Sequence, residues 1–148
     1  MKRFSKAITT VFGIGYTPIA SGTVGSFAAL ILYYFVKENI FIQVSIIVIG
    51  IFLGFLTIPQ VEKETGRKDP SIIVLDEVIG MFIALFLLPG TFGYMIAGFF
   101  LFRLFDILKP FPGRRLEKIP GTIGVIGDDV IAGIYANLIL HLFHYLFK

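Results

Sequence analysis

Residues 40–58 read IFIQVSIIVIGIFLGFLTI, an uncharged run that decides the fold of the chain. The hydrocarbon core of a bilayer is about 30 Å thick, and a helix needs about 20 apolar residues to cross it. The run therefore predicts a transmembrane helix. The composition agrees, because 56% of the 148 residues are hydrophobic and only 16% are charged. The mean hydropathy of +0.88 is too high for a soluble domain of this size.

Other apolar runs flank this one on both sides. Together they predict an all-α integral membrane helical bundle with about five transmembrane helices, at residues 22–36, 40–58, 71–88, 92–108 and 128–147. The first run is short for a crossing at about 1.5 Å per residue. Residues 4–17 are interrupted by glycine, and we interpret them as an N-terminal interfacial or re-entrant helix. The length predicts a single membrane-embedded domain, 1–148.

Lysine and arginine are unevenly distributed among the connections. With five spans and a cytoplasmic N-terminus, ten of the 13 fall on the inner side, two on the outer side, and Arg103 within the fourth span. Because an excess of these residues marks cytoplasmic loops, the count predicts a multi-pass protein with its N-terminus inside. The same orientation effect explains the net charge of +3 better than a nucleic-acid partner does.

Cysteine is absent, which excludes disulfides, thiolate metal sites and cysteine nucleophiles. His141 lies about 18 Å of helix beyond Asp129, and His144 lies further still. We therefore expect polar roles for both histidines near the opposite membrane face. The charged stretch 60–69 is interpreted as a solvated helical turn region that ends at Pro70, with a plain surface loop as the simpler alternative.

Half of the ten acidic residues lie within the predicted spans or at their edges. An ionisable group within a span costs about 3 kcal/mol, so it persists only with a partner or a function. The topology brings all of them to the inner face, where like charges need a neutraliser, and a divalent cation with oxygen ligands is the simplest one. The predicted catalytic and metal-binding residues are Asp76, Glu77, Asp106, Asp128 and Asp129.

Two simpler explanations remain open for part of this set. Asp128 and Asp129 are also suited to the N-terminus of a helix, where carboxylates cap free amides and favour the dipole. Asp106 lies three residues from both Arg103 and Lys109, so it is also suited to an ion pair on its own helix.

Basic and small residues are predicted to share the same face. Lys109, Arg114 and Arg115 occupy a proline-stiffened loop that suits an anionic headgroup. The glycine-rich stretch 13–26 allows close approach to a phosphate, with Thr23 and Ser26 as hydroxyl donors. A second such stretch is 121–127. Positive-inside anchoring and tight helix packing are the alternative explanations.

Several blocks of the sequence resemble the bacterial phosphatidylglycerophosphatase A family. They are GYTPIASGTVGS at 15–26, LDEVIG at 75–80, and FRLFDILKP at 102–110 running on to GDDVIAG at 127–133. Four positions depart from the family's usual residues: Ser21 replaces proline, Gly113 isoleucine, Glu117 aspartate and Thr122 glycine. The five acidic positions are intact.

The resemblance implies a magnesium-dependent enzyme of glycerophospholipid biosynthesis in the bacterial cytoplasmic membrane. Its reaction would convert phosphatidylglycerophosphate, an anionic phospholipid, to phosphatidylglycerol and phosphate. The acids would hold Mg²⁺ and activate water on the cytoplasmic side, while Arg103, Lys109, Arg114 and Arg115 would bind the phosphate. The alternative is a small cation or proton transporter, because intramembrane carboxylates also mark ion paths. The oligomeric state stays open.

Overall fold

The computed structural model describes residues 2–147, and the chain within these bounds is helical without strands. The expectation of an all-α fold is confirmed. In chain order the elements are α1 (Lys2–Thr9), the 3-10 turn η1 (Ile14–Tyr16), α2 (Ser21–Val36), α3 (Ile40–Thr65), α4 (Leu75–Leu85), α5 (Phe92–Leu108), α6 (Gly113–Leu116) and α7 (Thr122–Leu146).

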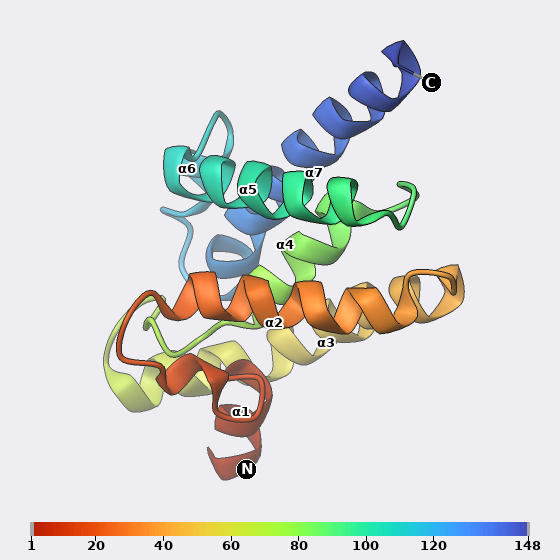
Figure 1. The fold of residues 1–148 in the computed structure, drawn as a ribbon. Coiled ribbons are helices and arrows are strands. Elements are labelled where there is room, and N and C mark those ends of the chain that lie inside the picture. Colours follow the sequence, from red (N-terminus) through yellow and green to blue (C-terminus); the bar gives the residue numbers. More distant parts are fainter. Residues whose placement is uncertain (1, 148) are drawn as a thin grey trace.

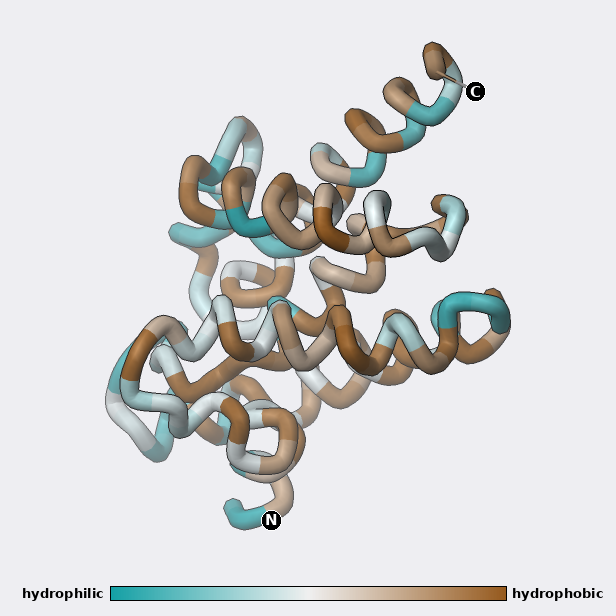
Figure 2. Tube along the Cα trace, in the orientation of Figure 1, coloured by the Kyte–Doolittle hydropathy of each residue, from teal (hydrophilic) through white to brown (hydrophobic). Residues whose placement is uncertain are grey.

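Two helices are long and apolar enough to cross a membrane. These are α3 with 26 residues and α7 with 25, and at about 1.5 Å per residue each exceeds the hydrocarbon core. The outer face of α3 is apolar and exposed, with Phe41 81% and Phe52 62% accessible, and hydrophilic residues gather in the connections (Figure 2). This surface suits lipid. Five spans remain a prediction.

Helix α4 is the centre of the bundle, packed against α2, α3, α5 and α7 (Figure 1). Nine of its 11 residues are buried. The predicted span 71–88 is therefore helical only over Leu75–Leu85, about 16 Å of helix. The helix ends at Leu85, Phe86 is extended, and Leu87 takes a left-handed conformation with φ +59°. A single helix across this segment was the wrong expectation for residues 71–74 and 86–88.

The C-terminal end of α4 lies inside the bundle, where its last carbonyls have no helical partner. Side chains of the neighbouring helices supply the donors. Tyr33 Oη donates to Leu85 O at 3.1 Å, and Asn137 Nδ2 donates to Phe86 O at 2.8 Å. His141 Nε2 lies 3.1 Å from the same Phe86 oxygen. These bonds allow a helix to stop within an apolar bundle, because each unsatisfied carbonyl there would be costly.

The N-terminal segment packs against the far end of α3. Ser5 Oγ donates to Gln60 Oε1 at 2.7 Å, and Lys6 forms an ion pair with Glu64 at 2.9 Å. The charged stretch 60–69 is therefore not all surface loop. Its first six residues complete α3, which ends where Gly66 takes φ +65°.

A close crossing of α4 and α7 sets the position of the acidic residues. A Cβ added at Gly133 would lie 2.5 Å from the backbone oxygen of Gly80, and one at Gly80 would lie 2.8 Å from Asp129 O. Only glycine lets two helix backbones approach so closely. The crossing therefore holds the backbone of Asp129 against α4.

Candidate active site

A polar cavity of about 440 Å³ lies at one end of the bundle. It is formed by the start of α2, the loop between α3 and α4, the first turn of α4, the end of α5 and the second turn of α7. Its lining residues are Thr17, Pro18, Ala20, Ser21, Gly22, Asp69, Ser71, Ile73, Asp76, Glu77, Arg103, Asp106, Lys109, Asp128 and Asp129.

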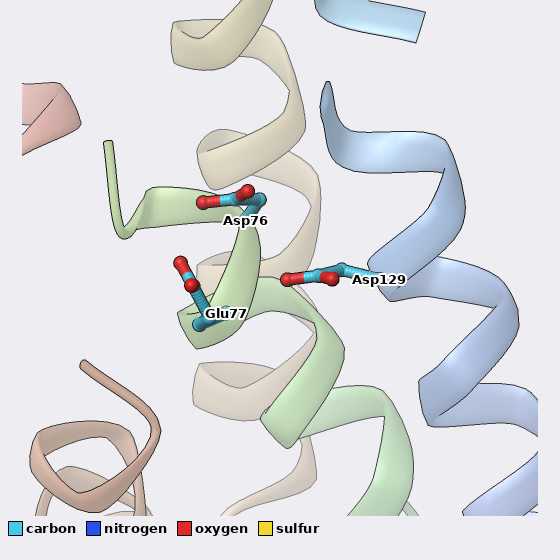
Figure 3. A group of neighbouring side chains, drawn as sticks. All are labelled: Asp76, Glu77 and Asp129. Carbon is cyan, nitrogen blue, oxygen red and sulfur yellow. The ribbon is translucent and has the colours of Figure 1, made fainter. Parts of the chain in front are cut away.

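The five predicted acids all line this cavity. Their carboxylates form two overlapping groups, in each of which one oxygen per residue lies within 4.8 Å of the others. The first group is Asp76, Glu77 and Asp129, drawn in Figure 3, where Asp129 on α7 points toward the pair on α4. The second is Asp106, Asp128 and Asp129. Asp129 belongs to both groups and so lies at the centre of the cluster.

The local structure decides between the explanations that the sequence left open. Asp76 and Glu77 occupy the first turn of α4, where the helix dipole favours negative charge. Helix α7 begins at Thr122, so Asp128 and Asp129 lie more than one turn inside it and do not cap its N-terminus. Helix capping is thus excluded for this pair. The predicted span that began at residue 128 starts six residues earlier.

Four of these acids keep a buried carboxylate oxygen without a hydrogen-bond partner in the described structure: Asp76 Oδ1, Glu77 Oε2, Asp128 Oδ1 and Asp129 Oδ2. Buried polar atoms are normally paired, and unpaired buried charge is strongly unfavourable. Oxygen-only donors from three helices match the preference of Mg²⁺ or a similar hard cation. The residues present therefore fit a divalent metal.

Two cations at the end of α5 border the acids. Arg103 forms an ion pair with Asp106, as one open explanation expected, and its Nη1 lies 3.5 Å from Ser26 Oγ. Lys109 Nζ lies 2.5 Å from Asp128 Oδ2 and 2.9 Å from Glu117 Oε1. Desolvation opposes the charge of Lys109, but its bonds to Asp128 and Glu117 outweigh this and raise the pKa of the ammonium. Lys109 is therefore charged at neutral pH.

The two other predicted cations do not line the cavity. Arg114 Nη2 donates to Leu108 O at 3.3 Å, and Arg115 lies over the ring of Phe111 at 4.8 Å. Both arginines are exposed. Both lie in the short helix α6, where the sequence predicts a loop.

The predicted hydroxyl donors also lie outside the cavity lining. Ser26 is fully buried, and its Oγ donates to Gly22 O at 2.7 Å. It contacts Arg103 instead of the cavity. Thr23 lies in the first turn of α2 and is half-buried.

The start of α2 contributes backbone amides to the cavity, and it lies within the glycine-rich stretch 13–26 that predicted close approach to a phosphate. Ala20 precedes the helix with φ +49° and, as alanine, has no side-chain cap for it. The first amides of a helix have no intrahelical partner, so those of α2 are available at the cavity. Ser21 Oγ donates to Ser71 O at 2.6 Å and ties this end of α2 to the α3–α4 loop.

Asp69 is a sixth acidic residue of the cavity lining, outside the predicted set of acids. The sequence predicts its place in a solvated charged stretch, whereas the loop after α3 brings it to the cavity wall. One feature of the sequence points to this position. Asp69 lies directly before Pro70 and seven residues before Asp76, in the connection that leads into the helix with Asp76 and Glu77.

The histidines lie where their separation from Asp129 predicted. Neither lines the cavity. His141 contacts Phe86 O, and His144 Nδ1 lies 2.8 Å from Tyr94 Oη. Both belong to the opposite end of α7.

A cluster of buried acids that fits a divalent metal, flanked by two cations in a bundle with an apolar exterior, is the arrangement expected of a membrane-associated enzyme that acts on phosphate esters. The sequence comparisons agree. The family model for phosphatidylglycerophosphatase A matches residues 7–144. The chain therefore belongs to the phosphatidylglycerophosphatase A family and is a phosphoric monoester hydrolase.

Individual relatives are similar to this chain over at least three quarters of their length. A Bacteroides thetaiotaomicron protein named putative phosphatidylinositol-3-phosphatase is 37% identical, with 90% of this chain and 89% of the relative covered. Phosphatidylglycerophosphatase A of Escherichia coli is 38% identical (88% and 77% covered), and that of Haemophilus influenzae is 36% identical (90% and 85% covered). No solved structure matches the chain.

Proposed function

We propose that this protein hydrolyses the terminal phosphomonoester of phosphatidylglycerophosphate in a reaction that requires Mg²⁺. The observation that carries the proposal is the convergence of five carboxylates with Arg103 and Lys109 on one cavity. Two relatives named phosphatidylglycerophosphatase A support the choice of substrate.

The metal would be held by Asp76, Glu77, Asp106, Asp128 and Asp129. Two carboxylate groups that share Asp129 favour two adjacent cation positions. When bound, Mg²⁺ supplies Lewis-acid stabilisation of the charge on the phosphoryl group. A carboxylate oxygen not used for coordination accepts the proton of the attacking water.

The phosphate would be held from the side of α2 and α5. Arg103 and Lys109 provide positive charge at the cavity, and the uncapped start of α2 provides amide donors at Ser21 and Gly22. These groups stabilise the charge that develops in the transition state, a contribution of about 10²–10³ in rate for one well-placed donor. Arg114 and Arg115 would act at the membrane surface, where they attract anionic lipid.

The cavity would face the cytoplasm in a five-span protein of the bacterial inner membrane. The uneven distribution of Lys and Arg supports this orientation. The lipid-facing surface of α3 supports burial in the bilayer, with the acyl chains of the substrate remaining among the lipids.

The decisive experiment measures phosphate release from phosphatidylglycerophosphate by purified protein, with Mg²⁺ and with chelator. Wild type is compared with Asp129→Asn and Glu77→Gln, and with Glu64→Gln as a control, because Glu64 pairs with Lys6 outside the cavity. We expect release only with Mg²⁺, a loss of at least about 100-fold in both cavity variants, and none in the control. Full activity in chelator, or in both cavity variants, would overturn the proposal.

A parallel assay on phosphatidylinositol 3-phosphate separates the two substrates for which the relatives are named. Phosphatidylglycerophosphate is expected to give the higher kcat/KM. A higher value for the inositol lipid would reassign the substrate while leaving the metal site unchanged. Uptake of Mg²⁺ into vesicles without phosphate release would instead support the transporter alternative.

A further inference from the structure

Asp69 is a carboxylate on the cavity wall that belongs to neither group of metal-fitting acids. Those groups come from α4, α5 and α7, whereas Asp69 lies in the loop between α3 and α4. Asp69 lines the same cavity as they do. If these two groups hold the metal, the carboxylate of Asp69 remains available for a different role in the same cavity.

The backbone around Asp69 is held in an unusual conformation. Asp69 takes φ +47°, in the left-handed region that residues with a side chain rarely adopt, and Pro70 follows it. Its amide donates to Glu62 Oε1 at 2.9 Å, and the amide of Ile73 donates to Pro70 O at 2.9 Å. Such conformations persist where the surroundings enforce them, and they concentrate at functional sites.

The same loop is fastened to the elements on both sides of it. Ser21 Oγ donates to Ser71 O at 2.6 Å, which joins the loop to the start of α2. Lys68 Nζ donates to the backbone oxygen of Glu117, which joins the loop to the connection before α7. Asp69 is therefore presented to the cavity from a fixed position between these two attachments.

The charged groups around Asp69 favour its protonated form. Asp128 faces it from α7, Glu62 from α3 and Glu117 from the connection after α6, while Lys109 at the end of α5 opposes them. Although the residue keeps exposed surface at the cavity mouth, desolvation by the surrounding chain and the charge of Asp128 raise the pKa of Asp69 to about 6. Asp69 therefore keeps its proton up to a higher pH than a free aspartate does.

We propose that Asp69 is the general acid of the reaction, donating its proton to the glycerol oxygen that leaves phosphorus. This role rests on the proposed function. A glycerol alkoxide is a poor leaving group, so protonation of its oxygen lowers the barrier. Carboxylates that coordinate a metal must be deprotonated and so would not donate a proton. The histidines lie at the other end of α7.

The proposed step gives one proton to the leaving oxygen and takes one from the attacking water. The bond between phosphorus and the glycerol oxygen breaks with its electron pair on oxygen, and that oxygen takes the proton of Asp69. A bond forms between phosphorus and the oxygen of the attacking water. The proton lost by this water passes to a carboxylate of the acidic cluster and from there to solvent, and Asp69 regains a proton from solvent. One water is consumed for each phosphate released.

The test compares a substrate that needs protonation of its leaving group with one that does not. Asp69→Asn keeps the side-chain shape, and asparagine tolerates the left-handed conformation, so the variant is expected to fold. We expect kcat on phosphatidylglycerophosphate to fall by about 100-fold or more, and kcat on 4-nitrophenyl phosphate by less than about fivefold. Wild-type kcat on the lipid should decline at high pH as the acid ionises, and this decline should be absent in Asp69→Asn.

The controls separate this proposal from the proposed function. Glu64→Gln should keep wild-type rates on both substrates, and Asp69→Asn should keep the wild-type Kd for Mg²⁺. Equal losses on the two phosphate esters, an unchanged rate on the lipid, or a retained decline at high pH would each overturn the role of Asp69. The pH profile uses the lipid alone, so it is decisive even when the aryl ester is a poor substrate. A wild-type protein inactive on the lipid would instead overturn the proposed function.

Discussion

Lys109 Nζ lies 2.5 Å from Asp128 Oδ2, so the residue directly after α5 is joined to the acidic cluster through α7. Lys109 itself takes φ +47°, a left-handed conformation that turns the chain away from the helix. The ion pair therefore places a permanent positive charge at the cavity where the loop leaves α5.

This relationship predicts the effect of removing the charge. Lys109→Gln should lower kcat/KM for the phospholipid roughly 30-fold, because a charge-assisted contact to the phosphate is lost. This factor corresponds to about 2 kcal/mol of transition-state stabilisation. Steady-state kinetics in mixed micelles measures this. Lys118→Gln, at an exposed position outside the cavity lining, is the matched control. An unchanged kcat/KM in Lys109→Gln would remove this residue from phosphate binding.

The crowded carboxylates predict that the metal stabilises the fold. At a Mg²⁺ concentration of about 100 times Kd, binding contributes about 2.7 kcal/mol, so the melting temperature of the wild type should rise by roughly 5–10 °C. Asp129→Asn should melt at or above the wild-type temperature without Mg²⁺, since one buried charge is gone, and should gain little when Mg²⁺ is added. Thermal unfolding in detergent measures both. An equal gain in the variant would argue against Asp129 as a ligand.

The close crossing of α4 and α7 predicts an unusually sensitive glycine. Gly133→Ala would place a methyl group 2.5 Å from the backbone oxygen of Gly80, which cannot rotate away. We expect a loss of about 1–3 kcal/mol in unfolding free energy, together with lower activity because Asp129 moves relative to α4. Gly93→Ala is the matched control, since a Cβ there meets nothing within 4 Å. Equal stability of the two variants would contradict the packing explanation.

The proposed orientation predicts which positions a membrane-impermeant thiol reagent can reach. The chain has no cysteine, so single cysteines can be introduced directly. Lys68→Cys and Arg115→Cys should label only after the membrane is opened, whereas Glu38→Cys, exposed at the connection between α2 and α3, should label in intact cells. Labelling of either loop cysteine from outside would place the cavity on the other side of the membrane.

Much of this protein could be predicted from its sequence, because lipid solvation leaves few choices. An uncharged run such as residues 40–58 must form a helix to satisfy its own backbone, and the acids must gather where they find partners. The convergence of Asp76, Glu77, Asp106, Asp128 and Asp129 on one cavity is therefore confirmed. The residues alone indicated a divalent-cation site, and the resemblance of their motifs to the phosphatidylglycerophosphatase A family indicated phosphate-ester chemistry.

Tertiary structure alone decided the rest. The shortness of α4 depends on Tyr33, Asn137 and His141, which supply donors from other helices and have no local signal. Asp69 reaches the cavity because the loop after α3 is tied to α2. Arg114 and Arg115 lie in the short helix α6, where they contact Leu108 O and the ring of Phe111 instead of the cavity. Hydropathy and charge along the chain determined which segments are helical and which groups need partners. The partners themselves were decided only when distant segments packed together.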